Sequence, residues 1–210
     1  MRLHATDPIS VYLAPRARID GFEVAELESA LYERMTAIRT LGMRRTMFVL
    51  PPELAPVVHQ ACTAKVAAAN RRRLVRLIED NHLAHDGTRW LADTEQAVLA
   101  ALVERGDALA GELSTAVPAP RAKVGMAVGK PYGAEVALTN QVLTNLAAQG
   151  RIVRGRPRGR WTSTQYRWAL IERWTSEAPD EAEAAALAAW LGDVWFKPKY
   201  RTPLERQLAG

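Results

Sequence analysis

The sequence contains one cysteine, Cys62, in 210 residues, so the chain cannot form a disulfide with itself. Cys62 lies in an apolar stretch, where an inert, buried thiol is more common than a nucleophile. No apolar run approaches the roughly 18 residues that a membrane-spanning helix needs, and the N-terminus shows no signal-peptide pattern. These absences favour a reducing compartment, the cytoplasm, and no membrane partner.

The sequence also lacks a convincing cofactor motif. Residues 125–130 (Gly-Met-Ala-Val-Gly-Lys) resemble a phosphate-binding loop, but the spacing is one residue short and Pro131 replaces the required Ser or Thr. His82, His85 and Asp86 lie close together, yet two histidines and one carboxylate without a nearby cysteine indicate zinc only weakly. We therefore expect no metal, no bound nucleotide and no other cofactor.

Positive charge is concentrated in one part of the chain. Residues 121–175 contain 10 Lys and Arg against 2 Asp and Glu, a net charge of +8, although the whole chain carries only +5. Residues 1–120 and 176–210 carry net charges of −1 and −2. A cluster of one sign is typical of a surface that binds the phosphate backbone of DNA. The alternative, a merely solvated face, usually mixes both signs.

An amphipathic helix is predicted over residues 137–149, within this basic segment. Its apolar positions recur at three- and four-residue steps and comprise Leu138, Val142, Leu143 and Leu146. Its other positions include short polar side chains suited to base edges or phosphates, namely Thr139, Asn140, Gln141 and Asn145. Gly150 follows, where a helix end favours the left-handed backbone conformation.

An arginine-rich β-hairpin is predicted over residues 151–168, directly after this helix. Six arginines and no acidic residue occupy these 18 positions. Pro157 and Gly159 favour a turn within residues 156–159, between two runs rich in β-branched and aromatic residues. A helix followed by a basic hairpin is the ending of a winged-helix DNA-binding domain. We therefore expect the hairpin to contact duplex DNA through Arg151, Arg154, Arg156, Arg158, Arg160, Trp161, Gln165, Tyr166 and Arg167.

A degenerate copy of the same pattern is predicted nearer the N-terminus. Asp20 is a possible cap of a short amphipathic helix, whose apolar positions are Val24, Leu27, Leu31 and Met35. Strands are expected over residues 37–41 and 46–50, around a basic tip. Arg44 and Arg45 in this tip are further candidate DNA contacts.

The rest of the chain is predicted to be mainly helical. Helices are expected over residues 53–80, 90–105 and 107–117, and a Pro- and Gly-rich insertion over residues 118–136. The longest helix contains four arginines that indicate a solvated face, with phosphate contact as the alternative: Arg71, Arg72, Arg73 and Arg76.

The predicted fold class is mainly α with small β-hairpin wings (α+β), a tandem winged helix-turn-helix. We expect a partial first winged helix over residues 1–50 and a complete one with the basic wing over residues 51–175. A C-terminal helix and a loosely ordered tail are expected over residues 176–210.

An imidazole, a hydroxyl and a carboxylate lie within four residues, at His4, Thr6 and Asp7. Such a segment ahead of Pro8 is more often a capped turn than an active site, because the polar side chains bond to the backbone of the turn. The alternative is catalytic. His4 could then accept the proton of a water near neutral pH, and Asp7 could stabilise a developing cation.

Three segments carry motifs that point to one family. They are residues 3–8 (Leu-His-Ala-Thr-Asp-Pro), 43–47 (Met-Arg-Arg-Thr-Met) and 150–168 (from Gly-Arg-Ile-Val-Arg-Gly to Tyr-Arg-Trp). In this order they resemble the tandem winged-helix DNA-binding family, whose characterised members are the AlkZ/YcaQ-like DNA glycosylases. The resemblance implies several winged helices with a β-rich C-terminal part, forming a concave basic surface for duplex DNA. It also implies excision of bulky alkylated purines and unhooking of interstrand crosslinks.

The candidate catalytic residues depart from the pattern of this family. Its Gln-x-Gln or Gln-x-Asp motif is matched here by His4 and Thr6, followed by Asp7. Its Arg-Gly-Thr-Leu-His motif is matched by residues 44–48 (Arg-Arg-Thr-Met-Phe), without the glycine and the histidine. The likeness ends near residue 177, so we expect a central fragment or a shortened relative.

Two functions follow from the sequence, and a third stays open. The first is binding of duplex DNA through helix 137–149 and hairpin 151–168, in a cytoplasmic, nucleoid-associated protein. The second is a cofactor-free DNA glycosylase, which hydrolyses the N-glycosidic bond of alkylated or crosslinked purines with His4, Thr6 and Asp7. The third is a protein whose exposed helix faces only mediate protein association. No feature of the sequence indicates an oligomeric state.

Overall fold

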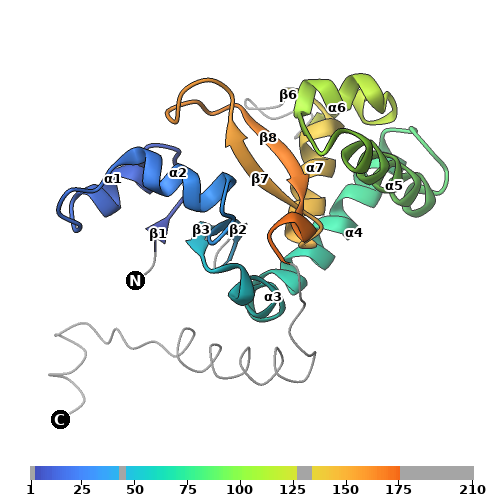
Figure 1. Ribbon diagram of the computed structural model, residues 1–210. Coiled ribbons are helices and arrows are strands. Elements are labelled where there is room, and N and C mark those ends of the chain that lie inside the picture. The colour runs from blue at the N-terminus through green and yellow to red at the C-terminus, as the bar shows by residue number, and fades with distance from the viewer. Residues whose placement is uncertain (1–2, 43–45, 127–133, 176–210) are drawn as a thin grey trace, which may run out of the picture.

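The N-terminal part of the fold is a small antiparallel sheet with two helices (Figure 1, blue). The computed structural model describes residues 3–42, 46–126 and 134–175. The elements in chain order are β1 (Leu3–His4), α1 (Ser10–Arg16), α2 (Val24–Tyr32), β2 (Ile38–Leu41) and β3 (Met47–Leu50). The strands lie in the order β1-β3-β2. The predicted hairpin is thus confirmed, although its tip with Arg44 and Arg45 lies outside the described residues.

Helix α2 has other boundaries than the sequence pattern predicts. The side chain of Glu26 accepts a hydrogen bond from the backbone N–H of Glu23 (3.4 Å), so the N-cap is Glu23 and not Asp20. The helix ends at Tyr32, and Met35 adopts a left-handed backbone conformation with a φ of 54°. Met35 still packs against the core. Because Met35 is apolar and follows Leu31 by four residues, the sequence pattern continues past the actual end of the helix.

A continuous helical segment connects the two halves of the fold. It consists of η2 (Pro52–Leu54), α3 (Ala55–Val58), the π-helical turn η3 (His59–Thr63) and α4 (Ala64–Asp80). The helix predicted over residues 53–80 is thus present, but it contains one widened turn. Cys62 lies in this turn, and burial raises the pKa of its thiol, as expected for an inert cysteine.

The second half repeats the arrangement of the first with longer elements. Its main elements are α5 (Gly87–Arg105), β4 (Asp107–Leu109), α6 (Ala110–Ala116), α7 (Leu138–Ala148), β7 (Ile152–Pro157), β8 (Tyr166–Leu170) and the short η5 (Ile171–Arg173). The strand order β4-β8-β7 matches the order β1-β3-β2. In both halves a short strand, two helices and a hairpin follow one another, which is the arrangement of a winged helix. The predicted fold class, mainly α with small β wings, is confirmed.

Two predictions about the segment before α7 need revision. The helix predicted over residues 107–117 begins only at Ala110, because the residues before it form β4. A strand of three residues is too short to show an alternating pattern. The insertion over residues 118–136 contains regular structure, namely η4 (Ala119–Arg121), β5 (Lys123–Met126) and β6 (Ala134–Ala137), with β5 and β6 paired antiparallel.

The turn of the second hairpin is wider than predicted. Pro157 does not open a tight turn but ends β7, where it lies opposite Tyr166 across an irregular register. The loop therefore covers residues 158–165 rather than 156–159. Gly159 does lie in this loop in the left-handed conformation, with a φ of 77°. Gly150 after α7 is also left-handed, with a φ of 71°, as predicted.

The apolar face of α7 forms the centre of the main core. Leu138, Val142, Leu143 and Leu146 are all fully buried, as their spacing predicts. They pack with residues of α4 and α5 and with Trp168 of β8. The core thus fixes which face of α7 can be exposed.

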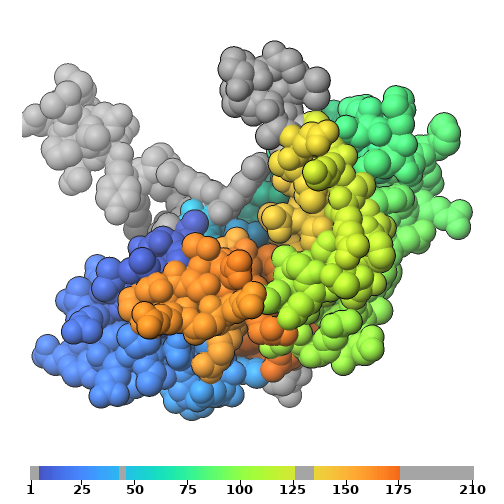
Figure 2. All heavy atoms as spheres, turned by 90° about the horizontal axis from the view of Figure 1, so that it is seen from above, coloured from blue at the N-terminus to red at the C-terminus, as the bar shows by residue number. Residues whose placement is uncertain are grey.

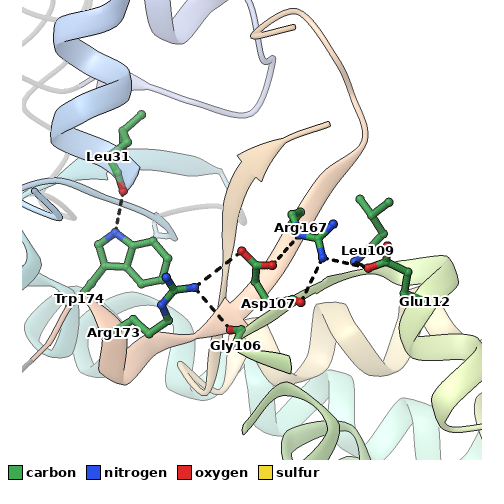
Figure 3. A network of polar contacts seen from close by, with 8 residues as sticks. All are labelled: Leu31, Gly106, Asp107, Leu109, Glu112, Arg167, Arg173 and Trp174. Carbon is green, nitrogen blue, oxygen red and sulfur yellow. Dashed lines mark hydrogen bonds and ion pairs between the residues drawn. The ribbon is translucent and has the colours of Figure 1, made fainter. Parts of the chain in front are cut away.

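The two halves meet at a shared apolar cluster, here called the seam. Its buried members come from both halves and comprise Ile38, Ala55, Val153, Ala169 and Trp174. The indole N–H of Trp174 donates a hydrogen bond to the carbonyl oxygen of Leu31 (2.8 Å), at the base of the hairpin (Figure 3). Apolar burial and a buried hydrogen bond therefore join the halves.

Two predictions extend beyond the described part of the chain. The C-terminal helix and tail over residues 176–210 lie outside it, so the division into residues 1–50, 51–175 and 176–210 stays a prediction. Within the described part, no helix has both the length and the apolar character needed to cross a membrane.

Leu143→Ala should lower the free energy of unfolding by about 2–5 kcal/mol, because it removes fully buried methyl groups and leaves a cavity. Val103→Ala is the matched control, since Val103 on α5 is 70% exposed and should change stability by less than about 0.5 kcal/mol. Urea unfolding followed by circular dichroism measures both. Equal losses in the two variants would contradict the assignment of the core face.

Candidate functional site

The turn between β1 and α1 contains two of the three candidate catalytic residues. The carboxylate of Asp7 accepts hydrogen bonds from the backbone N–H and from the hydroxyl of Ser10, both at 2.7 Å. The bond from the Ser10 hydroxyl is the main reason why the pKa of Asp7 lies below its usual range. Asp7 is exposed and closes the first turn of α1, which is the role of a capped turn.

Strand pairing brings two of the motif segments side by side. The hydroxyl of Thr6 accepts a hydrogen bond from the backbone N–H of Met47 (3.0 Å), and Ala5 N–H donates to the Met47 carbonyl (2.8 Å). His4 pairs with Phe48 across β1 and β3. Residues 3–6 and 47–49 therefore form one local structure. The catalytic role of the His4 imidazole stays a prediction, because that side chain lies outside what the structure describes.

A buried arginine that the sequence did not indicate supports this turn. Arg39 of β2 is only 4% exposed, and its Nη2 donates a hydrogen bond to the carbonyl oxygen of Ala5 (2.8 Å). The guanidinium thus connects β2 to the residue before Thr6. Nothing in a four-residue strand distinguishes a buried arginine from an exposed one, so sequence reasoning missed it.

Two of the four polar residues expected to face DNA from α7 are buried. The hydroxyl of Thr139 donates to the carbonyl oxygen of Pro120 (3.0 Å), and the amide of Asn145 donates to Glu95 (2.8 Å). The prediction that these two residues face DNA is therefore wrong, because η4 and α5 cover them. Asn140 is exposed and Gln141 is partly exposed, so these two remain available.

A buried carboxylate holds α7 in position. Glu95 of α5, 7% exposed, accepts hydrogen bonds at Oε1 from the side chains of Asn145 and Gln149, each at 2.8 Å. Its Oε2 pairs with Arg71 of α4. One carboxylate with three donors thus links three helices, and its charge is compensated where water cannot reach it. Arg71 is therefore not simply part of a solvated face.

The arginines of the hairpin fall into two groups, and the first group holds the fold together. Arg156 lies 3.7 Å from a carboxylate oxygen of Glu28 and 3.1 Å from one of Glu33, both from the first half. Its guanidinium also lies over the ring of Tyr32, 5.2 Å from the ring centroid. Arg156 therefore connects the hairpin to the first half, and two carboxylates already compensate its charge.

Arg167 is held by two carboxylates of the second half, from β4 and α6 (Figure 3). Its Nε lies 2.5 Å from Asp107, and its Nη2 lies 3.1 Å from Glu112. The hydrogen bond to Asp107 raises the pKa of Arg167. Asp107 also lies 3.7 Å from Arg173. A phosphate would have to displace these partners, so Arg167 is a poor DNA contact.

Three further predicted contacts pack inward. The guanidinium of Arg154 lies over the ring of Tyr166, 4.3 Å from its centroid, and burial lowers the pKa of Arg154. Trp161 packs on Tyr12 of α1, with ring centroids 5.0 Å apart. Trp161 therefore attaches the hairpin loop to the first half.

The second group of arginines is free to bind a ligand. Arg151, Arg158 and Arg160 are exposed, and no ion pair of theirs occurs in the described part of the chain. Gln165 in the same loop is also exposed. On the exposed surface of the hairpin, the charge that the sequence spreads over six arginines is thus available at three of them.

A groove of about 710 Å³ lies between the hairpin loop and the helices of the second half. Asn140 and Thr144 of α7 line it on one side, and Arg158 and Gln165 on the other, while Glu112 lies at the start of α6. Figure 2 shows the orange hairpin between the blue N-terminal helices and the yellow and yellow-green residues of α7 and α6. The groove combines a cation with amide and hydroxyl groups, which can bond to phosphates and base edges.

The remaining candidate sites are weaker. Arg71, Arg72 and Arg76 line a second hollow of about 620 Å³ beside Thr88, so phosphate contact stays open there. His82 and His85 line a hollow of about 420 Å³. In residues 3–42, 46–126 and 134–175, however, no three His, Cys, Asp or Glu side chains are grouped closely enough to hold a metal ion.

The chain matches a protein-family model and is similar in fold to a solved structure. The family model described as DNA glycosylase AlkZ-like matches residues 2–195. Among solved structures, the DNA glycosylase AlkZ of Streptomyces sahachiroi is similar in fold, with a TM-score of 0.50 and 18% sequence identity. The likeness covers 86% of this chain and 48% of that protein, so the chain spans about half its length. A search of curated protein sequences finds no match.

Glu95→Gln should lower the free energy of unfolding by about 1–3 kcal/mol, because the amide keeps one acceptor oxygen for Asn145 and Gln149 but turns an NH2 donor toward Arg71, which loses its charged partner. Asp93→Asn, on the same helix, is the control. Its pair with Arg89 is exposed on both sides, so its loss should change stability by less than about 0.5 kcal/mol. If denaturant unfolding gives equal values for both variants, Glu95 does not hold α7.

Proposed function

The chain belongs to the DNA glycosylase AlkZ-like family, and on this premise we propose that it binds double-stranded DNA. One observation of the structure carries the proposal, namely the groove between α7 and the hairpin loop, where Arg158 lies with Asn140 and Thr144 and has no ion pair with any described residue. In winged-helix proteins the helix before the hairpin enters the major groove, which is wide enough for one helix. This geometry favours a duplex over a single strand.

The contacts proposed for DNA are fewer than the sequence predicts. Six residues are available for phosphates and base edges: Asn140, Gln141, Arg151, Arg158, Arg160 and Gln165. Thr144 is exposed on α7 and is added to them. Of the other predicted hairpin residues, Arg156 and Arg167 pair with carboxylates, and Trp161 and Tyr166 pack inward, which positions the available ones. Arg154 also packs inward, but it lines a small cavity and has no carboxylate partner among the described residues.

The negative charge of Glu112, which also lines the groove, does not argue against DNA binding. The carboxylate of Glu112 accepts hydrogen bonds from the backbone N–H of Leu109 (2.9 Å) and from Arg167 (3.1 Å). Its negative charge is therefore compensated locally by Arg167. The charge that a phosphate meets first is that of Arg158, at the rim formed by the hairpin loop.

The two halves have different tasks in this proposal. Residues 51–175 form the complete winged helix that contacts DNA. Residues 1–50 form a partial winged helix, which supports the hairpin through Glu28, Glu33 and Tyr12.

Replacing Arg151, Arg158 and Arg160 together by Gln should weaken duplex binding and lower the slope of log affinity against log salt by up to about 2.7, at about 0.9 per phosphate contact. A comparison variant of equal charge replaces Arg72, Arg73 and Arg76 on α4, the alternative place for phosphate contacts, and should leave the slope unaltered if DNA binds at the hairpin. Fluorescence anisotropy with a labelled duplex at several KCl concentrations measures both. A slope lowered only by the α4 variant would move the interface to that helix.

A second candidate function is cleavage of the glycosidic bond of an alkylated purine. The observation that favours it is the pairing of residues 3–6 with residues 47–49. An N7-alkylated purine is already a cation and leaves without an acid, so an enzyme has only to position a water and stabilise the sugar cation. The exposed carboxylate of Asp7, whose pKa is lowered, stays ionised at neutral and mildly acidic pH and suits the second task.

Release of free base from a duplex that contains N7-methylguanine tests this candidate. If it holds, Asp7→Asn and Thr6→Val should lose base release but keep duplex affinity, because the arginines lie elsewhere. Loss of base release in His4→Ala, with duplex affinity retained, would assign the base to His4. No release by the wild-type protein above the spontaneous rate would leave DNA binding alone.

A further inference from the structure

Two arginines at the contact of the two halves have no carboxylate partner in the described part of the chain. Arg39 of β2 is 4% exposed, and Arg154 of β7 is largely covered. Neither takes part in any ion pair of the described residues. Buried charges in proteins are nearly always paired, because water no longer compensates them.

The contacts that these arginines do make leave their charge uncompensated. Arg39 donates from Nη2 to one carbonyl oxygen, that of Ala5, and its buried Nε has no partner. Arg154 lies over the neutral ring of Tyr166. Desolvation, and after it the charge of Arg39, lowers the pKa of Arg154. Both residues line one small cavity, so two positive charges lie at the same place in the fold.

Asp7 is an acidic residue on which the charge of Arg39 acts, but it forms no ion pair with Arg39. Asp7 is exposed, and its carboxylate is occupied by Ser10. The charge of Arg39 is the smallest of the influences that lower the pKa of Asp7. Among residues 3–42, 46–126 and 134–175, the two arginines thus have no carboxylate partner.

Both arginines line a small cavity that adjoins the proposed DNA interface. The cavity has a volume of about 30 Å³, enough for about two oxygen-sized atoms. Thr40 of β2 and Thr144 of α7 also line it. Thr144 lines the large groove beside the hairpin as well, so the cavity lies next to that groove.

We propose that Arg39 and Arg154 bind one phosphodiester of the DNA backbone, whose two non-bridging oxygens enter this cavity. The proposal rests on the proposed binding of duplex DNA. Guanidinium groups suit a phosphate because their planar N–H donors match its oxygens in pairs. Thr40 and Thr144 line the same cavity, so their hydroxyls are further possible donors to the phosphate. Because Arg39 also holds Ala5, the bound phosphate would lie next to the turn with Thr6 and Asp7.

Arg154→Gln is the main test, with Arg89→Gln as a control of equal charge on an exposed part of α5. Arg154→Gln should weaken duplex binding by roughly tenfold, as expected for the loss of a charged hydrogen bond, and lower the salt slope by about 0.9. Arg89→Gln should change neither. Arg154→Lys, which keeps the charge without the planar fork, should fall between Arg154→Gln and the wild type.

A second measurement uses inorganic phosphate in place of DNA. Sodium phosphate should raise the melting temperature of the wild-type protein above that in sodium chloride of equal ionic strength, and Arg154→Gln and Arg39→Gln should abolish the difference. Phosphate binding is judged from this difference, so a lower melting temperature of Arg39→Gln in both salts does not affect it.

The outcomes separate this proposal from the proposed function. If the wild type binds duplex DNA, and Arg154→Gln binds it equally well with the same salt slope, the phosphate site is refuted and DNA binding stands. If the wild type does not bind DNA, the proposed function and the DNA phosphate fail together, even where inorganic phosphate stabilises the protein. Loss of affinity, slope and phosphate stabilisation in Arg154→Gln, with Arg89→Gln unchanged, supports the site.

Discussion

The orientation of α7 depends on the carboxylate of Glu95. Burying this charge is favourable only while Arg71, Asn145 and Gln149 donate to it, so three helices must meet at one place. The apolar face of α7 alone would allow small rotations, because Leu and Val side chains pack without strict direction. The hydrogen bonds remove this freedom. They decide that Asn140 and not Asn145 is presented to the groove.

The hairpin is positioned in the same way, by residues that the ligand need not touch. Arg156 pairs with carboxylates of the first half, Arg167 with those of the second, and Trp161 packs on Tyr12. These contacts are made before any ligand arrives. The exposed arginines therefore project from a backbone that is already ordered, and binding has less conformational entropy to overcome.

Sequence reasoning succeeded where the signal is local and failed where it depends on partners far along the chain. The apolar period of α7 lies within 11 residues and predicts its buried face correctly. The six arginines of the hairpin look alike in sequence, because the carboxylates that hold Arg156 and Arg167 come from α2, β4 and α6. Thr139 and Asn145 resemble surface residues until η4 and α5 cover them. The pairing of β1 with β3 is likewise visible only in three dimensions.

The hairpin is fastened at both ends, by Trp161 at its loop and by Trp174 just beyond its base. A wing held in this way cannot swing to follow the curvature of a duplex. In a complex with DNA the deformation would then fall on the nucleic acid, whose bending energy depends on its base steps. Flexible steps, and sites where a damaged base has weakened stacking, are the easiest to deform. A rigid protein of this kind could thus select its site by the stiffness of DNA, without a side chain that recognises any particular base.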